Sequence, residues 1–387
     1  MLTNESSSTS LEQYLVSRNI SPETSIFFDI ETTGFKPEYS HLYLIGTAFC
    51  RPGAPSCPSG KRDWTILQWL CEKPQDEPQL LRTFAGFLQS YDTIIHFNGD
   101  RFDLPYLENK YEQYGIPSPF RKMKSIDLYQ DFRPLRSFLR LEHMNQKSLE
   151  LFLGLEREDQ YDGGKLIPVY RNFCKTGSPE KAELLLLHNR EDVSGMLTLT
   201  RLYSYLNFLE PETAENVLSG DSFPPAKQFT KISSEVLENR DGTKKLLFTF
   251  PLKTQVPVPV SRSYDFGYLT LNKSTGKLLL PMLKDTLYYY FADYKNYYYL
   301  PREDQAIHKS VAAYVDKEYR QPATKTNCYT KQTGLFLPQP EELFTPAFRR
   351  SCDDTLSWFL WKEEEWEDPS RKARYLDSLT RAICRQK

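Results

Sequence analysis

The sequence predicts an α/β protein with a mixed five-stranded sheet flanked by helices, followed by a smaller α+β C-terminal domain. Three observations support this fold class. In the first half, three β-like runs are followed by short strands separated by helical patterns, which is typical of a mixed sheet. The second half combines hairpin signals with helical patterns. The 387 residues, 40% of them hydrophobic, suffice for more than one core, so we expect two domains.

Strands are expected where β-branched and aromatic residues gather between residues that form turns. Five stretches have this composition, at residues 25–31, 42–50, 63–70, 93–97 and 124–128. The Pro/Gly/Ser-rich stretch 51–62 suits a loop of an antiparallel meander. The last two strands are separated by helical sequence, which makes the sheet mixed.

Two helices of the first half are marked by their sequence patterns. Residues 78–91 carry apolar side chains at helical spacing: Leu80, Leu81, Phe84, Phe87 and Leu88. A longer helical pattern runs from Ser178 to about Leu209 and closes this half of the chain. Ser178 is its expected N-cap, and Pro179 takes the first helical position.

Composition also predicts the limits of the domains. A flexible N-terminus should span residues 1–20, and its Ser/Thr-rich first ten residues should be disordered. The mixed-sheet domain should span 21–210, a linker 211–228, and the accessory α+β domain 229–387.

Hairpins and helices are the elements expected in the second domain. Asp241-Gly242 and a turn at 272–276 mark two hairpins. We also expect a helix at 304–319, a turn at 331–334 and two helices at the end of the chain.

Composition argues against several classes of protein. The formal net charge is −2, so no general excess of basic residues points to nucleic acid. The seven cysteines are scattered without a C-x-x-C spacing, which favours free thiols over a zinc ribbon or a disulfide framework. No apolar run approaches the roughly 18 residues of a membrane span, and the first residues lack a signal-peptide pattern. We therefore expect a soluble, cytoplasmic protein without membrane association.

The stretch IFFDIETTGF, residues 26–35, places two acids inside an apolar β-like run. Alternate side chains of a strand point to opposite faces, so Asp29 and Glu31 share one face. Two adjacent carboxylates near apolar strands are costly unless they are protonated, paired or bound to a cation. A metal site explains the pair. A strand end at which both acids meet solvent or a helix N-terminus explains it about as well.

A further acid follows the fourth expected strand. In the stretch TIIHFNGDRFDLPYL, Asn98 ends the strand and Asp103 begins the next element. Both would lie at the carboxyl edge of the sheet, where open α/β sheets place their sites. Asp103 could equally be a helix N-cap, and Asp100 is a competing acid.

The long helix contains a third group in the stretch LLLLHNREDVSGMLTL. At about 100° per residue, His188 and Asp192 lie on one face, one turn apart, and Gly195 continues that face without a side chain. The helix could therefore approach the sheet closely at this face. The alternative is a surface i,i+4 pair, with Glu191 as a rival carboxylate.

In this order, the motifs DIETTG, Nx3FDLP and HxxxD resemble the DEDD superfamily of 3'-to-5' exonucleases with a ribonuclease-H-like fold, over residues 20–210. They look most like its YprB-type branch. The resemblance implies four metal-binding catalytic carboxylates: Asp29, Glu31, Asp103 and Asp192. It also implies that His188 orients or deprotonates the attacking water. The three-residue gap between His188 and the last acid is typical of tyrosine-type members, so this histidine stands where a tyrosine usually does.

Carboxylate oxygens without thiolates suit Mg²⁺ or Mn²⁺, and two such ions can bind one phosphodiester. The resemblance therefore implies a metal-dependent nuclease that acts on DNA or RNA as a 3'-to-5' exonuclease, with two such ions. A nucleic-acid-processing partner could bind through the C-terminal domain. Two alternatives stay open: a catalytically silent ribonuclease-H-like module that binds nucleic acid or protein, and a proofreading subunit that accompanies a polymerase.

The resemblance further implies contacts with the substrate, at Thr32, Thr33, Gly34, Phe35 and Asn98. The family places backbone contacts to the terminal nucleotide directly after the first two acids, and Phe35 could stack on a base. A plain turn explains these residues nearly as well.

The second domain has two tyrosine runs, at residues 288–290 and 297–299, flanked by Lys284 and Lys295. They could form a stacking surface for single-stranded nucleic acid. Because alternate strand residues point into a core, core packing is the favoured interpretation.

Overall fold

The computed structural model describes residues 1–51, 61–158, 161, 163–209 and 231–385. The chain divides into two compact units, Met1–Asn207 with Val256–Val258, and Phe208–Gln255 with Pro259–Lys387. The predicted linker 211–228 lies outside the described residues.

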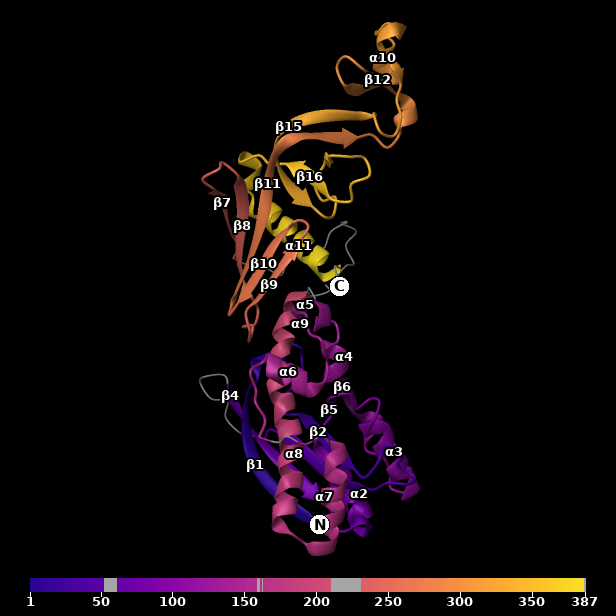
Figure 1. The fold of residues 1–387 in the computed structure, drawn as a ribbon, viewed down its shortest axis with the longest axis vertical. Helices are drawn as coiled ribbons and strands as arrows, with labels where there is room; N and C mark the ends of the chain where they lie inside the picture. Colours follow the sequence, from indigo (N-terminus) through magenta and orange to yellow (C-terminus); the bar gives the residue numbers. More distant parts are fainter. Residues whose placement is uncertain (52–60, 159–160, 162, 210–230, 386–387) are drawn as a thin grey trace. The chain divides into compact units, whose positions relative to one another are not determined.

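The first unit contains a six-stranded mixed sheet with the strand order β1-β4-β3-β2-β5-β6 (Figure 1). Its strands are β1 (Leu2–Leu11), β2 (Ser25–Thr32), β3 (Leu42–Phe49), β4 (Lys61–Leu70), β5 (Thr93–His96) and β6 (Lys124–Asp127). β5 pairs in parallel with β2 and with β6, and the other neighbours are antiparallel. The five predicted strands are thus confirmed as members of one mixed sheet.

The sixth strand, β1, corrects the prediction of a disordered N-terminus. Leu2–Leu11 pairs along its whole length with Lys61–Leu70 of β4. This pairing satisfies backbone groups that an edge strand would otherwise leave open. The amino group of Met1 also forms an ion pair with Glu72. Composition misleads here because backbone pairing between strands does not require apolar side chains.

Nine helices of four or more residues are described in residues 1–209: α1 (Gln13–Val16), α2 (Glu77–Phe87), α3 (Asp103–Gln113), α4 (Leu128–Phe132), α5 (Leu135–Leu139), α6 (Gln146–Phe152), α7 (Gly163–Thr176), α8 (Pro179–Leu199) and α9 (Tyr203–Leu209). The Ser178 side chain accepts a hydrogen bond from the backbone N–H of Lys181, which confirms the predicted N-cap of α8. A single 3₁₀ turn, Thr200–Leu202, separates α8 from α9.

The two faces of the sheet have different coverings. On one face, Phe28 of β2 contacts Phe84 of α2, with ring centroids 5.8 Å apart, in a core to which α3 also contributes. On the other face, helix α8 contacts β1, β2, β3 and β4. Asp29 and Glu31 alternate with Phe28 and Ile30 along β2, so both acids belong to the face that α8 covers.

The described residues of the second unit are rich in β-structure and form two sheets. Its strands are β7 (Ser233–Glu238), β8 (Lys244–Pro251), β9 (Val260–Tyr264), β10 (Gly267–Asn272), β11 (Thr275–Tyr290), β12 (Tyr297–Leu300), β13 (Gln305–His308), β14 (Gln321–Pro322), β15 (Tyr329–Gln339) and β16 (Ser357–Leu360). β12, β13 and β14 form a small separate sheet. Its helices are α10 (Lys309–Ala312) and α11 (Pro369–Arg385). Both predicted hairpins are confirmed, as β7–β8 and β10–β11.

Three predictions for the second unit are wrong. The expected helix at 304–319 is instead β13, the single-turn α10 and a 3₁₀ turn. β13 pairs with β12, and Val311 and Tyr314 of the expected apolar face are 58% and 92% exposed. The expected turn at 331–334 lies inside β15, which pairs with β11. Only one of the two helices expected at the end of the chain is present in its described residues, and β16 precedes it.

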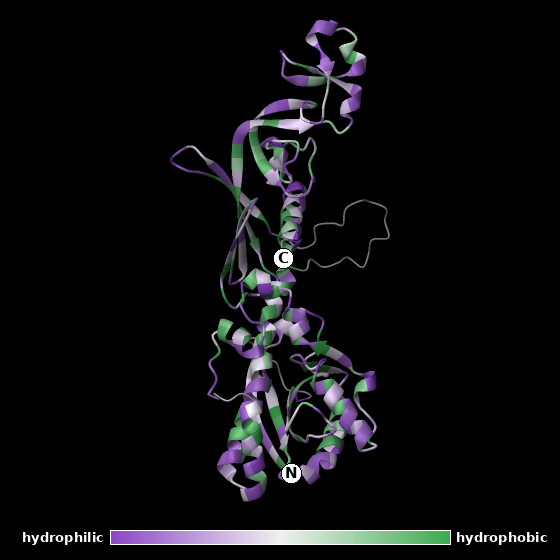
Figure 2. Cartoon of the chain, turned by 45° about the vertical axis from the view of Figure 1, so that its right-hand side comes forward, coloured by the Kyte–Doolittle hydropathy of each residue, from purple (hydrophilic) through white to green (hydrophobic). Residues whose placement is uncertain are grey.

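The tyrosine runs pack within the second unit. All six rings are half-buried, and Tyr288 meets Tyr329 edge to face at 4.6 Å. Asp304 accepts hydrogen bonds from Tyr299 and Tyr329 and from Lys331, and these bonds lower the pKa of Asp304 to about 2. In Figure 2 the segment around α10 is largely hydrophilic.

Among the described residues, no helix combines the length and apolar character that crossing a membrane requires.

Candidate active site

The first two candidate residues project from the end of the central strand β2. Asp29 lies opposite Gly46 of β3, and Glu31 lies opposite Leu44. The pairing becomes irregular directly after Glu31, where the strand ends. Glu31 is 8% exposed, so its carboxylate lies largely within the protein. Glu31 therefore does not simply meet solvent at the end of the strand.

The third candidate acid begins helix α3, which follows β5. Asp103 is 7% exposed, whereas the side chain of its rival Asp100 is 46% exposed and accepts a hydrogen bond from Ser125. Since β2 and β5 are parallel neighbours, their carboxyl ends meet at the same edge of the sheet. Asp103 and the two acids of β2 therefore belong to one edge.

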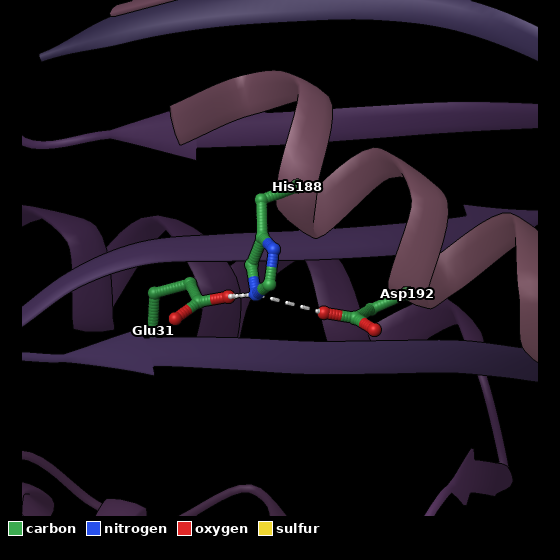
Figure 3. A group of neighbouring side chains, drawn as sticks. All are labelled: Glu31, His188 and Asp192. Carbon is green, nitrogen blue, oxygen red and sulfur yellow. Dashed lines mark ion pairs between the residues drawn. The ribbon is translucent and has the colours of Figure 1, made fainter. Parts of the chain in front are cut away.

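The remaining candidates, His188 and Asp192, lie one turn apart on α8. His188 Nε2 is 3.3 Å from Glu31 Oε1 and 3.3 Å from Asp192 Oδ2 (Figure 3). The donor atoms of these three residues all lie within 4.8 Å of one another, which is close enough for one metal ion. The rival Glu191 accepts a hydrogen bond from the backbone N–H of Glu158 instead.

Burial and neighbouring charges raise the pKa values of two of the acids. Burial raises the pKa of Asp29 well above its usual range, and the charges of Asp192, Asp103 and Glu31 raise it further. Burial likewise raises the pKa of Asp103 to about 7, with smaller contributions from Asp127 and Asp192. The charges of four carboxylates from three distant segments thus act on one another at this edge of the sheet. A divalent cation would relieve this repulsion.

Asn189 holds Asp29 in place, and we did not predict this role from the sequence. Its Nδ2 donates a hydrogen bond of 3.0 Å to Asp29 Oδ2, which opposes the rise in pKa of that acid. Its Oδ1 accepts one of 2.9 Å from Gln68 of β4, and both amides are fully buried. The sequence signal is Gly46, a residue without a side chain in the bulky strand LYLIGTAF, since a Cβ there would collide with Asn189 Oδ1.

Replacing Gly46 with alanine is expected to destabilise the chain by about 1–3 kcal/mol, because the added methyl group overpacks the contact between β3 and α8. Urea unfolding measures the change. Gly86 of α2 is the matched control, since a Cβ there meets nothing within 4 Å and alanine should stabilise the helix by about 0.5–1 kcal/mol. Equal effects of the two substitutions would contradict this packing.

Gly195 contacts a different element from the one that the sequence led us to expect. We expected the missing side chain to let the sheet pack closely against α8, but a Cβ at Gly195 would collide with Glu150 of α6. The close approach of α8 to the sheet occurs at Asn189 instead. Arg157, which no local pattern marks, donates from Nη1 to Asp192 Oδ1 at 2.6 Å.

The residues expected to contact substrate lie at the end of β2 and in the loops that follow β2 and β5. Thr32 Oγ1 donates to the Gly34 carbonyl, and Thr33 N–H donates to the His41 carbonyl, so the first loop is held by internal hydrogen bonds. Phe35 is 88% exposed and touches Phe102 edge to face.

In the second loop, Asn98 adopts a left-handed conformation with φ of 61°. Its backbone N–H donates to Asp127 Oδ1 at 2.7 Å. Asp127 also accepts from the backbone of Tyr129 and is therefore the N-cap of α4.

A family model and two known polymerases match parts of this chain. Residues 26–207 match the family model described as the RNase_H superfamily. A stretch of 66 residues is 36% identical to DNA polymerase 1 from Aeropyrum pernix and covers 17% of this chain and 7% of that polymerase. The structure of the family B DNA polymerase from the hyperthermophilic archaeon Pyrobaculum calidifontis matches 48% of this chain and 25% of that chain, with 18% identity and a TM-score of 0.36.

The chain therefore spans a small part of the length of both polymerases. Together with the family match, the six-stranded mixed sheet flanked by helices confirms the predicted ribonuclease-H-like fold.

Proposed function

We propose, from the ribonuclease-H-like fold of residues 26–207, that this protein is a metal-dependent nuclease acting on phosphodiester bonds of DNA or RNA. More narrowly, we infer a 3'-to-5' exonuclease of the DEDD type. One observation carries the proposal: His188 Nε2 on α8 lies 3.3 Å from Glu31 of β2 and 3.3 Å from Asp192, so helix and strand bring metal-ligand side chains together. Sequence similarity to a DNA polymerase over 66 residues adds support for a nucleic-acid substrate.

The side chains of the pocket fit hard divalent cations. They offer carboxylate oxygens and one imidazole, without a thiolate, and such sets suit Mg²⁺ or Mn²⁺. The residues that would hold two such ions are Asp29, Glu31, Asp103 and Asp192. When bound, the ions supply Lewis-acid activation of the attacking water and stabilise the charge on the leaving oxygen.

His188 is proposed to take the proton of the attacking water. Its Nε2 lies between Glu31 and Asp192, so the imidazole is oriented toward the pocket. The side chain is 5% exposed, which limits its movement and its contact with bulk water. A positioned base of this kind contributes about 10²–10⁴-fold to the rate.

Replacing His188 with glutamine is expected to lower kcat by about 10²–10⁴-fold, because the pocket then lacks this proton acceptor. Single-turnover hydrolysis of an end-labelled oligonucleotide measures the loss. His143, which is exposed, is the matched control, and His143→Gln should keep the parental rate. A parental rate in His188→Gln would assign proton transfer to another group.

Thr32, Thr33, Gly34, Phe35 and Asn98 are proposed to contact the terminal nucleotides. The exposed ring of Phe35 is available for stacking on a base, which is worth about 1–3 kcal/mol in other proteins. The hydrogen bonds within its loop would keep the ring in place before substrate binds.

The proposed function is tested with DNA and RNA oligonucleotides labelled at the 5' end, in single-stranded and duplex form, with Mg²⁺, Mn²⁺ or EDTA. Stepwise shortening from the 3' end that stops in EDTA supports the exonuclease. Cleavage at internal positions would support a metal-dependent nuclease but contradict the 3'-to-5' assignment. Absence of both cleavage and metal binding would favour a catalytically silent module.

A further inference from the structure

We propose that Arg157 is a positioning residue that fixes the carboxylate of Asp192 for cation binding, an inference that rests on the proposed function. The two oxygens of this carboxylate have different neighbours. Arg157 Nη1 donates to Oδ1 at 2.6 Å, while Oδ2 lies 3.3 Å from His188 Nε2. The guanidinium thus binds Oδ1 and leaves Oδ2 directed toward His188.

Arg157 is itself held by a buried partner. Its Nε and Nη2 donate to the two carboxylate oxygens of Glu150, at 2.5 and 2.7 Å, in a bidentate arrangement. Glu150 is 1% exposed and fits there because Gly195 has no side chain. Gln146 joins both sides, donating to Glu150 Oε1 and to the backbone carbonyl of Asp192. The guanidinium is therefore anchored and is not free to swing toward a substrate phosphate.

The turn after α6 explains how the chain delivers this arginine. Gly154 ends the helix with φ of 76°, a conformation that favours glycine, and Leu155 N–H donates back to the Glu150 carbonyl. The chain then runs to α8, where the backbone N–H of Glu158 binds the Glu191 side chain at 2.8 Å. Arg157 directly precedes Glu158, so this hydrogen bond holds the backbone of Arg157 close to α8.

Positioning matters because Asp192 faces like charges. Its side chain is 18% exposed, so without a partner the carboxylate would turn away from Asp29 and Asp103 toward water. Holding one oxygen with a cation opposes that rotation. Partners that orient metal ligands typically contribute about 10–100-fold to metal affinity.

The test uses the full chain and Mn²⁺ as the probe, with free Mn²⁺ measured by electron paramagnetic resonance. The double substitution Glu150→Gln with Arg157→Met removes both charges of the buried pair, so neither is left alone. The folded fraction of each variant is measured by circular dichroism, and the affinity is calculated for the folded protein. We expect the Mn²⁺ affinity of the double variant to fall about 10–100-fold. The matched control is Glu12→Gln with Arg62→Met, which removes another ion pair of the same unit and should keep the parental affinity.

A second variant keeps the inference testable if the double variant does not fold. Arg157→Lys retains the charge, but one ammonium group lacks the planar fork that binds two carboxylates at once. We expect it to bind Mn²⁺ about tenfold more weakly than the parent. Parental or tighter affinity in either folded variant would overturn the inference.

Failure of the proposed function gives a different result. In that case the parent itself would not bind Mn²⁺, or Asp192→Asn would bind it as well as the parent does. If Asp192→Asn weakens binding and the Arg157 variants do not, the inference about Arg157 alone is overturned.

Discussion

Replacing Asp29 with asparagine is expected to reduce phosphodiester hydrolysis by several powers of ten while the chain stays folded. Burial raises the pKa of Asp29 and the charges of the three other carboxylates raise it further, so we place Asp29 among the ligands of the proposed cation site. An amide of nearly the same shape removes the charge that the cations require. It also removes repulsion, so the melting temperature of the metal-free chain should hold or rise.

The rate is measured by single-turnover hydrolysis with Mg²⁺ in excess, and the melting temperature is measured with EDTA. Asp63→Asn is the control, because Asp63 is an exposed aspartate on β4 of the same sheet. The control should match the parent in both measurements. Undiminished hydrolysis by Asp29→Asn would mean that a contaminating nuclease or other residues carry the activity.

Divalent cations are expected to stabilise the chain strongly at pH 8 and weakly at pH 5. The pKa of Asp103 is about 7 in the folded chain and 3.8 in its ordinary state. Between these values the folded chain binds more protons than the unfolded chain, so the contribution of Asp103 to stability falls as the pH rises. Without metal, this contribution should lower the free energy of unfolding by a few kcal/mol between pH 4 and pH 8.

Cations reverse this loss because they bind the deprotonated carboxylates. Thermal melting is compared in about 1 mM Mg²⁺ and in EDTA. For a dissociation constant of about 1 μM, this Mg²⁺ concentration is roughly a thousandfold excess and should give a shift worth about 4 kcal/mol at pH 8. Asp103→Asn removes the titrating group and should lose most of both the pH dependence and the cation effect. A parental response in this variant would place the cation elsewhere.

Local patterns in the sequence were sufficient to predict most strands and helices of the first unit. Strands such as 25–31 and 93–97 are recognisable because β-branched and aromatic residues lie between turn residues, and the Ser178-Pro179 start of α8 depends on backbone groups next to it in the chain. The strand Leu2–Leu11 was not recognisable, since its partner β4 lies about 60 residues away. The expected helix at 304–319 failed because Gln305–His308 pairs with β12 as a strand, and Val311 and Tyr314 of its expected apolar face are exposed.

By itself, the sequence determined that acids would occur at the ends of particular elements: Asp29 and Glu31 on a strand, Asp103 at a helix start, and the pair His188 and Asp192 one helical turn apart. These are short-range properties, because strand and helix periodicities decide which side chains share a face. Only the tertiary structure decided that these segments meet, since convergence depends on the parallel pairing of β2 with β5 and the packing of α8 on the sheet. It also decided what supports the acids. The amide of Asn189 and the guanidinium of Arg157 bind Asp29 and Asp192, from which they are distant in the sequence. No local periodicity of the sequence predicts such contacts.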